Sequence, residues 1–176
     1  MIVELNGQIG CGKMTIGRVL ADRLGARLLD NHTIYNPAFA TTGFRTPDFY
    51  EMARAVRTLC FERVRKLGNE VPIVLTVAAG RDEDWGREWQ QAIRALADAR
   101  GDVLHGVHLQ CALDEHRRRL TDPARAVMRK LTDLSLLGEQ DRPVRLDHSD
   151  RMLTLDVTAL TAAQAALRIA AWLNAA

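Results

Sequence analysis

Residues 7–15 combine glycines and one lysine at a spacing that is able to bind phosphate. They read Gly-Gln-Ile-Gly-Cys-Gly-Lys-Met-Thr, so that four residues separate Gly7 from the pair Gly12-Lys13. Glycines allow successive backbone N–H groups to turn inward around phosphate oxygens. The Lys13 ammonium can then reach the β- and γ-phosphates of a nucleotide and neutralise charge during transfer. We expect a nucleotide-phosphate site made of Gly7, Gly10, Cys11, Gly12, Lys13, Met14 and Thr15.

The flanking residues supply the strand–loop–helix context that this motif, the P-loop, requires. The run from Ile2 to Asn6 is typical of a strand, and apolar residues recur with helical spacing from Lys13 to Leu24, where Gly25 ends the helix. The N-terminal end of that helix adds partial positive charge beside the phosphates. The alternative is an ordinary glycine-rich turn, but the lysine, the spacing and the context together favour the P-loop.

One position departs from the P-loop pattern. The residue after the lysine is normally Ser or Thr, whose hydroxyl binds Mg²⁺, whereas here it is Met14. A thioether has little affinity for a hard cation, and the Thr15 side chain is rotated by about 100° around the helix. Two interpretations remain open. Either Asp30, the nucleotide phosphates and water hold Mg²⁺, which we favour, or metal binding is weak and the chain is a poor catalyst.

The rest of the chain alternates apolar runs with helical stretches, which is typical of βαβ units around a parallel sheet. We expect strands at 2–6, 26–29, 71–77, 103–110 and 152–155. We expect helices at 13–24, 47–67, 82–101, 113–120 and 161–172, and a loop that contains Pro37, Gly43 and Pro47. Thr46 and Pro47 supply an N-cap and a first-turn proline for the helix that follows. His105 and His108 are expected to be strand residues rather than metal ligands.

The composition describes a globular chain without a general affinity for polyanions. The 176 residues are 47% hydrophobic and carry a formal net charge of +2, so we expect one domain and neither nucleic-acid nor membrane partners. No apolar run is long enough to span a bilayer, and no secretory signal is expected. Cys11, Cys60 and Cys111 are widely spaced, which favours free thiols in a cytoplasmic protein. The sequence carries no signal for the oligomeric state.

Together these features resemble the small P-loop kinases, which include shikimate kinase, gluconate kinase, chloramphenicol phosphotransferase and the nucleoside monophosphate kinases. The resemblance covers most of the chain, from residues 7–15 and Asp30 to the arginine-rich helix at 113–120 and the final strand–helix pair. Gly-Lys-Met-Thr followed later by Asn31-His32 also resembles an uncharacterised branch of that superfamily. The resemblance implies a single P-loop kinase-like domain over residues 1–176. Its fold would be an α/β three-layer sandwich of the P-loop NTPase type, with a five-stranded parallel sheet in the order 2-3-1-4-5 and an arginine-rich lid.

The resemblance also implies where the phosphate acceptor binds. In the shikimate and gluconate kinases an Asp at the end of the second strand contacts the hydroxyl that takes the phosphate, and Asp30 matches that position. A carboxylate there orients or accepts a hydroxyl proton, so we expect Asp30 to be catalytic, to bind substrate and to be a Mg²⁺ ligand. The alternative for Asp30 is a helix cap or turn. His32 and Arg81 are further substrate-binding candidates in and near a substrate segment at 31–58, although a structural role for His32 is an equal alternative.

The lid implied by the resemblance spans approximately residues 114–131. Its basic side chains are Arg117, Arg118, Arg119, Arg125, Arg129 and Lys130. Guanidinium groups stack on a base and form forked hydrogen bonds to phosphate. We therefore expect Arg117 and Arg118 to bind the nucleotide, and Arg118 to stabilise the transferring charge. The alternative is a solvated helix face.

These expectations describe an ATP- and Mg²⁺-dependent phosphotransferase for a small hydroxyl- or phosphate-bearing molecule. The alternative is a nucleotide-binding regulatory protein with weak or no kinase activity, for which Met14 is the reason. A mechanical or DNA-remodelling ATPase is a third class of function, which the short length of the chain disfavours. Residues 78–81 read Ala-Ala-Gly-Arg where shikimate kinases have a glycine triplet, and the Arg-Pro-Leu-Leu lid of those enzymes is missing. Shikimate is therefore not the expected acceptor.

Overall fold

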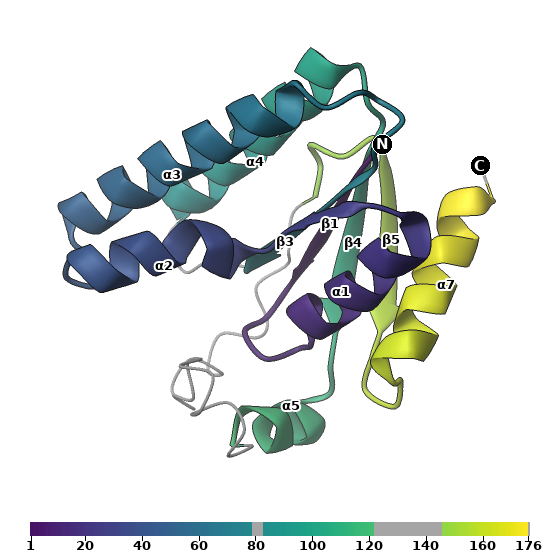
Figure 1. The fold of residues 1–176 in the computed structure, drawn as a ribbon. Helices are drawn as coiled ribbons and strands as arrows, with labels where there is room; N and C mark the ends of the chain where they lie inside the picture. Colours follow the sequence, from purple (N-terminus) through teal and green to yellow (C-terminus); the bar gives the residue numbers. More distant parts are fainter. Residues whose placement is uncertain (79–82, 122–145, 176) are drawn as a thin grey trace.

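A five-stranded parallel sheet forms the centre of the protein (Figure 1). The structure is a computed structural model that describes residues 1–78, 83–121 and 146–175. The strands are β1 (Ile2–Gly7), β2 (Arg27–Leu29), β3 (Ile73–Ala78), β4 (Leu104–Gln110) and β5 (Arg151–Asp156). Their order is β2-β3-β1-β4-β5, and every neighbouring pair is parallel. The expected strand order is therefore confirmed.

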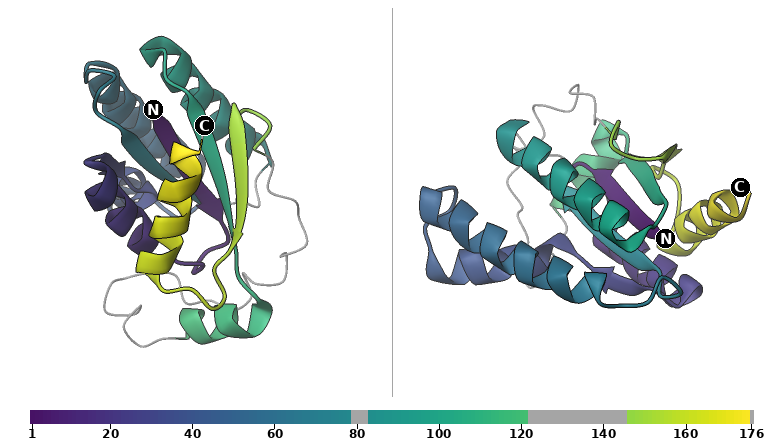
Figure 2. Two further views of the ribbon diagram at one scale, coloured as in Figure 1. Left: turned by 90° about the vertical axis from the view of Figure 1, so that its right-hand side faces the viewer. Right: turned by 90° about the horizontal axis from the view of Figure 1, so that it is seen from above.

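Helices cover both faces of this sheet. The helices of the described ranges are α1 (Lys13–Leu24), α2 (Asn31–Thr41), α3 (Pro47–Arg65), α4 (Glu83–Arg100), α5 (Leu113–Leu120) and α7 (Ala162–Asn174). Figure 2 shows α1 and α7 on one side of the strands and α3 and α4 on the other. The expected three-layer α/β architecture is confirmed. In the described ranges, no helix combines the length and the apolar character needed to cross a membrane.

The central strand β1 shows how the sequence builds a sheet that is buried on both faces. All of its residues are buried, because helices pack on either side. Val3 and Leu5 join the apolar cluster under α1 and α7, while Ile2 joins the cluster under α3 and α4. Burying an aliphatic side chain of this size contributes roughly 1.5–3 kcal/mol. The strand that leads into the glycine-rich loop is therefore held firmly from both sides.

The helix starts are of two kinds. Among the helix starts that the structure describes, side chains cap three, namely Asp30 on α2, Thr46 on α3 and Thr161 on α7. Each of these side chains accepts a backbone N–H that has no partner within its own helix. By contrast, α1 begins after Gly12, so no side chain caps it, and its first turn contains no acidic residue. This end of α1 is suited to an anion from outside the chain.

The prediction of a loop around Pro37 is wrong, because Pro37 lies inside helix α2. Proline in a helix interior lacks one N–H and crowds the preceding turn, at a cost of about 3 kcal/mol. Two features of α2 offset this cost. Asp30 caps the helix start, and Ile34 and Ala38 are buried to 1% and 0% exposure. The rest of the prediction is confirmed, since Thr46 is the N-cap and Pro47 opens α3.

Candidate functional site

The loop between β1 and α1 has the backbone that a phosphate cradle requires. Gly10 and Gly12 have φ values of 96° and 100°, in the left-handed region that a residue with a Cβ rarely adopts. Space at Gly10 is also restricted, since a Cβ there would lie 2.8 Å from Leu120 Cδ2. The shape of the loop therefore depends on glycines that the sequence predicted to bind phosphate.

The Lys13 ammonium lies against the same loop. Its Nζ donates hydrogen bonds to the carbonyl oxygens of Gly7, at 2.6 Å, and Gln8, at 2.7 Å. Only 8% of Lys13 is exposed. An ammonium out of water is costly unless it is hydrogen-bonded, and these two carbonyls meet that need. They hold the positive charge at the mouth of the loop, which is where phosphate oxygens are expected.

Burial and the charge of Lys13 both lower the pKa of His108. It lies on β4 opposite Asn6 of β1, and its pKa is lowered by burial and, as a smaller effect, by the Lys13 ammonium. Both causes disfavour the protonated imidazole. The expectation that His108 is a strand residue is confirmed, but its position beside the lysine was not foreseen from the sequence.

A buried polar chain supports the first residue of the loop. Asn6 Oδ1 accepts from the Gly7 amide at 2.7 Å, and Asn6 Nδ2 donates to Glu4 Oε1 at 3.0 Å. His148 Nε2 donates to Glu4 Oε2 at 2.7 Å, and Glu4 is 0% exposed. These bonds fix the end of β1 from which the loop departs. Two polar residues within an otherwise apolar strand were the sequence signal for this support.

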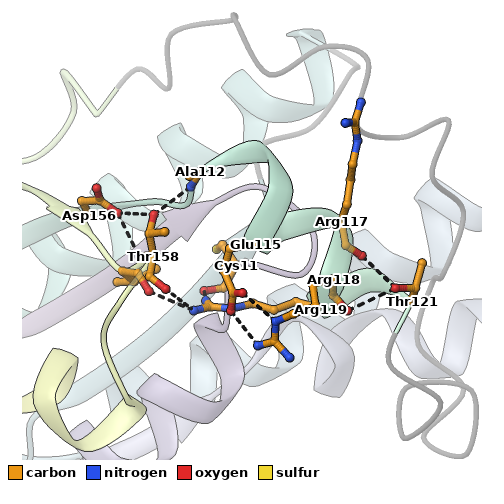
Figure 3. A network of polar contacts seen from close by, with 10 residues as sticks. Cys11, Ala112, Glu115, Arg117, Arg118, Arg119, Thr121, Asp156 and Thr158 are labelled. Atoms are coloured by element: carbon orange, nitrogen blue, oxygen red, sulfur yellow. Dashed lines mark hydrogen bonds and ion pairs between the residues drawn. The ribbon is translucent and has the colours of Figure 1, made fainter.

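Helix α5 holds the loop through two side chains, Arg119, whose contacts Figure 3 shows, and His116. Arg119 Nη1 donates to the Cys11 carbonyl oxygen at 3.2 Å, and Arg119 Nη2 donates to the Val157 carbonyl oxygen at 2.9 Å. His116 Nε2 donates to the carbonyl oxygen of Ile9. Arg119 therefore ties the P-loop to the segment that joins β5 to α7.

The two arginines predicted to bind nucleotide lie on the exposed side of α5. The Arg117 side chain is 58% exposed and lies 3.8 Å from Asp114, and in Figure 3 it points away from the rest of the network. The Arg118 side chain is 70% exposed and donates two hydrogen bonds to Glu115. Their roles toward a nucleotide stay predictions. Arg119 was counted in the predicted lid but not among the nucleotide-binding residues, and its contact with the loop was not predicted, because the sequence does not show which of three consecutive arginines faces the loop.

Asp30 lies at the carboxyl edge of the sheet, as predicted, and caps α2. Its Oδ1 accepts from the amides of His32, at 2.9 Å, and Thr33, at 3.3 Å. Its Oδ2 has the Thr33 hydroxyl at 3.4 Å, so it retains lone pairs for a substrate hydroxyl or a metal. The Asn31 amide donates to Thr76 Oγ1 of β3 at 3.0 Å, which anchors the start of α2. The capping role is observed, while the roles of Asp30 and His32 toward substrate stay predictions.

The residues present fit Mg²⁺ only in part. Met14 is half-buried and Thr15 is exposed, and the thioether does not replace the usual hydroxyl ligand. No group of three or more His, Cys, Asp or Glu that would hold a metal occurs within the described ranges. Mg²⁺ keeps several waters and needs few protein ligands. The role of Asp30 as a Mg²⁺ ligand stays a prediction.

Part of the predicted site lies outside the described residues. This applies to Arg81, Arg125, Arg129 and Lys130. Within the lid range 114–131, the structure describes residues 114–121, which are part of α5 and its C-cap Thr121. The arginine-rich lid therefore stays a prediction.

Several solved kinase structures share this fold. A putative kinase from Chloroflexus aurantiacus superposes with a TM-score of 0.69 at 15% identity, covering 99% of this chain and 96% of that one. The Mycobacterium tuberculosis APS kinase, solved with AMPPNP and APS, gives a TM-score of 0.63 at 18% identity, covering 98% and 96%. Shikimate kinase from Bacteroides thetaiotaomicron gives 0.61 at 17% identity, covering 99% and 98%.

Sequence comparison gives no such likeness. No protein-family model matches the chain, and no curated protein matches it. Identities of 15–21% to the solved structures establish the fold alone. The structural neighbours of this chain are shikimate, gluconate and APS kinases and similar proteins, so it has the fold of the P-loop small-molecule kinases.

Proposed function

We propose that this chain is an ATP-dependent phosphotransferase that moves the γ-phosphate of ATP to a small hydroxyl- or phosphate-bearing molecule. The observation that carries the proposal is the position of Lys13, whose buried ammonium lies on the carbonyls of Gly7 and Gln8. It stands beside a helix start that has no side-chain cap. A cation and helix amides that converge in this way suit nucleotide phosphates. The kinase fold supports the same class of reaction.

Each residue has a defined task in this proposal. The loop amides and Lys13 hold the β- and γ-phosphates, and Asp30 Oδ2 orients the acceptor hydroxyl or takes its proton. Mg²⁺ would neutralise charge on the phosphates, with Asp30 as its protein ligand. Arg117 and Arg118 would turn toward the nucleotide, since ion pairs as exposed as theirs are weak and exchangeable.

The alternative is a nucleotide-binding regulatory protein with weak or no kinase activity. The reason to consider this alternative is Met14, which supplies no hydroxyl at the position where a P-loop normally has a Mg²⁺ ligand. Both functions require ATP to bind. They differ in whether phosphate is transferred.

The test is Mg²⁺-dependent phosphate transfer from ATP to a panel of sugars, nucleosides, nucleotides and aminoglycosides. The matched variants are Asp30→Asn, which preserves the helix cap because Asn and Asp cap equally well, and Asp30→Ala, which removes it. We expect Asp30→Asn to unfold at the wild-type temperature while turnover falls by about a hundredfold or more. Transfer that survives in Asp30→Asn would remove Asp30 from the mechanism. ATP binding without transfer to any member of the panel would favour the regulatory alternative.

A further inference from the structure

A chain of four hydrogen bonds joins His148, in the turn before β5, to the ammonium of Lys13. His148 Nε2 donates to Glu4 Oε2 at 2.7 Å, and Asn6 Nδ2 donates to Glu4 Oε1 at 3.0 Å. The Gly7 amide donates to Asn6 Oδ1 at 2.7 Å. The Gly7 carbonyl oxygen then accepts from Lys13 Nζ at 2.6 Å. A turn that is far from the P-loop in the sequence is therefore connected to the cation of that loop.

The central member of this chain, Glu4, is a carboxylate without access to water. It is 0% exposed, and in the described ranges its two oxygens accept from Asn6 and His148. A buried carboxylate is costly unless it is hydrogen-bonded. Removal of the imidazole would leave Oε2 without a donor, so the carboxylate would have to move toward another one. Such a movement changes the group to which Asn6 is bonded.

Gly7 has little freedom to absorb this movement. Its amide is bonded to Asn6 and its carbonyl oxygen to Lys13. A Cβ at Gly7 would lie 2.6 Å from the Leu109 carbonyl oxygen and 3.0 Å from Cys11 Sγ, so the residue is closely surrounded. A reorientation of its amide therefore also turns the carbonyl oxygen that holds the ammonium.

A glycine of β4 gives the turn that carries His148 its place on the sheet. Gly106 is the Cα partner of Glu4 in the pairing of β1 with β4. A Cβ at Gly106 would lie 2.5 Å from Ser149 Oγ and 3.2 Å from Leu146 Cδ1. Glycine within a strand often marks the close approach of another segment. The missing side chain leaves the space in which the turn packs and from which His148 reaches Glu4.

Further contacts fix the position of this turn. Arg94 Nη1 of α4 donates to the His148 carbonyl oxygen at 3.3 Å, and the Leu104 amide donates to Asp150 Oδ2 at 2.7 Å. The His148 side chain is 10% exposed, and its Nδ1 has no hydrogen-bond partner in the part of the chain that the structure describes. Among those residues, the bond to Glu4 is therefore the polar contact that orients the imidazole.

We propose that His148 is a positioning residue that places the Lys13 ammonium for nucleotide phosphates. It acts through the side chains of Glu4 and Asn6 and the backbone of Gly7, and it does not touch the nucleotide. This inference rests on the proposed function, to which it adds a residue that controls the affinity for ATP.

The first test compares two replacements of His148 by calorimetric titration of the full chain with ATP. Gln reaches about as far as the imidazole Nε2 and has an N–H that donates to Glu4, whereas Ala has none. We expect His148→Ala to bind ATP about threefold to tenfold more weakly than the wild type, and His148→Gln to recover most of that loss.

Ser149→Ala is the matched control. It changes the same turn, but Ser149 Oγ has no hydrogen-bond partner among the described residues, so this variant should bind ATP as the wild type does. Equal affinities of His148→Ala and the wild type would overturn the inference. An equal loss in Ser149→Ala would overturn it as well, because the turn as a whole would then be responsible.

A double variant tests whether His148 acts through the chain. Glu4→Gln keeps the size of the side chain but offers one oxygen to two donors, so it breaks one link. The double variant Glu4→Gln/His148→Ala should then lose no more ATP affinity than the weaker-binding single variant. Independent losses that combine in full would contradict the proposal. Gly106→Ala, which displaces the turn and keeps the imidazole, replaces Glu4→Gln in this comparison if that variant does not fold.

A readout without nucleotide separates this inference from the proposed function. In proton–nitrogen correlation spectra, the Gly7 amide resonance reports its hydrogen bond to Asn6. It should move in His148→Ala and return toward its wild-type position in His148→Gln, although both variants lack the ring. An unchanged resonance in His148→Ala overturns the positioning role whether or not ATP binds, and Lys13-dependent ATP binding would then leave the proposed function standing. If the resonance responds and the wild type does not bind ATP, the chain of hydrogen bonds stands and the proposed function is wrong.

Discussion

Arg119 Nη1 donates a hydrogen bond to the carbonyl oxygen of Cys11 at 3.2 Å, and this contact joins α5 to the P-loop. The same guanidinium reaches the carbonyl oxygens of Val157 and Thr158, and its Nε donates to Glu115 Oε1 at 2.7 Å. Three separate segments therefore meet on one side chain. The loop between β1 and α1 is therefore held by a residue that is far from it in the sequence.

Arg119→Ala should loosen the P-loop. Hydrogen bonds from a charged donor contribute about 1.5–3 kcal/mol, so we expect the free energy of unfolding to fall by about 2 kcal/mol and amide exchange in residues 8–12 to accelerate. Arg117→Ala is the matched comparison for stability, because its ion pair with Asp114 is exposed and contributes about 0–1 kcal/mol. Urea unfolding and hydrogen exchange measure both effects. Equal stability losses in the two variants would contradict this reading of Arg119.

Gly10→Ala should destabilise the protein through both backbone and space. The φ of Gly10 is 96°, and an added Cβ would lie 2.8 Å from Leu120 Cδ2 and 3.3 Å from His116 Nε2. We expect a loss of about 1–3 kcal/mol in the free energy of unfolding. Gly86→Ala is the control, since a Cβ at Gly86 in α4 meets nothing within 4 Å. That variant should gain about 0.5–1 kcal/mol, and a gain at Gly10 as well would show that the loop is not constrained.

Glu88 should contribute to stability at neutral pH and lose that contribution in acid. Hydrogen bonds from Arg54 and Arg57 lower the pKa of Glu88 from 4.5 to about 2. The unfolded chain therefore binds this proton first as pH falls, so the stabilisation is complete above pH 4.5 and disappears as pH approaches 2. Because the Glu88 side chain is 32% exposed, we expect only about 1 kcal/mol.

The measurement compares wild type with Glu88→Gln between pH 2 and pH 7. The stability difference between the two proteins should be constant above pH 5 and should shrink below pH 4.5. A difference that does not change with pH would mean that the carboxylate charge is not what stabilises α3 against α4.

Met14→Thr should strengthen the Mg²⁺ dependence of nucleotide binding. It places a hydroxyl where other P-loops have one, so we expect ATP affinity in the presence of Mg²⁺ to rise about threefold to tenfold, with no change in its absence. Met14→Leu is the matched control, because it keeps an apolar side chain of similar volume. Calorimetric titrations with and without Mg²⁺ give the comparison. A similar gain in Met14→Leu would attribute the effect to packing instead of metal binding.

Most strands and helices could be predicted from the sequence because each level of its pattern agreed with the others. The apolar strand Ile2–Asn6, the glycines and the helix at Lys13–Leu24 each specify their own structure locally. The strand order followed from the resemblance, and the register of β1 between β3 and β4 confirms it. The loop predicted around Pro37 is instead part of α2, because the burial of Ile34 and Ala38 is a tertiary effect that local sequence does not show.

The site was harder to foresee, because its supporting contacts join residues that are distant in the chain. Arg119 reaches Cys11, and His148 reaches Glu4, only after the sheet has formed. The cap formed by Asp30 was a local feature and was among the interpretations of the sequence. Contacts between segments depend on helix register and strand packing, which spacing along a single sequence does not determine.

The most direct test of the central claim is calorimetric titration of the full chain with ATP, repeated on Lys13→Ala. The claim is that the buried ammonium on the Gly7 and Gln8 carbonyls marks a nucleotide-phosphate site. Lys66→Ala, which changes an exposed lysine at the end of α3, is the control. We predict that the wild type and Lys66→Ala bind ATP equally and that Lys13→Ala loses about a hundredfold in affinity. A wild type without ATP affinity, or a Lys13→Ala variant that binds ATP as well as the wild type, would contradict the claim.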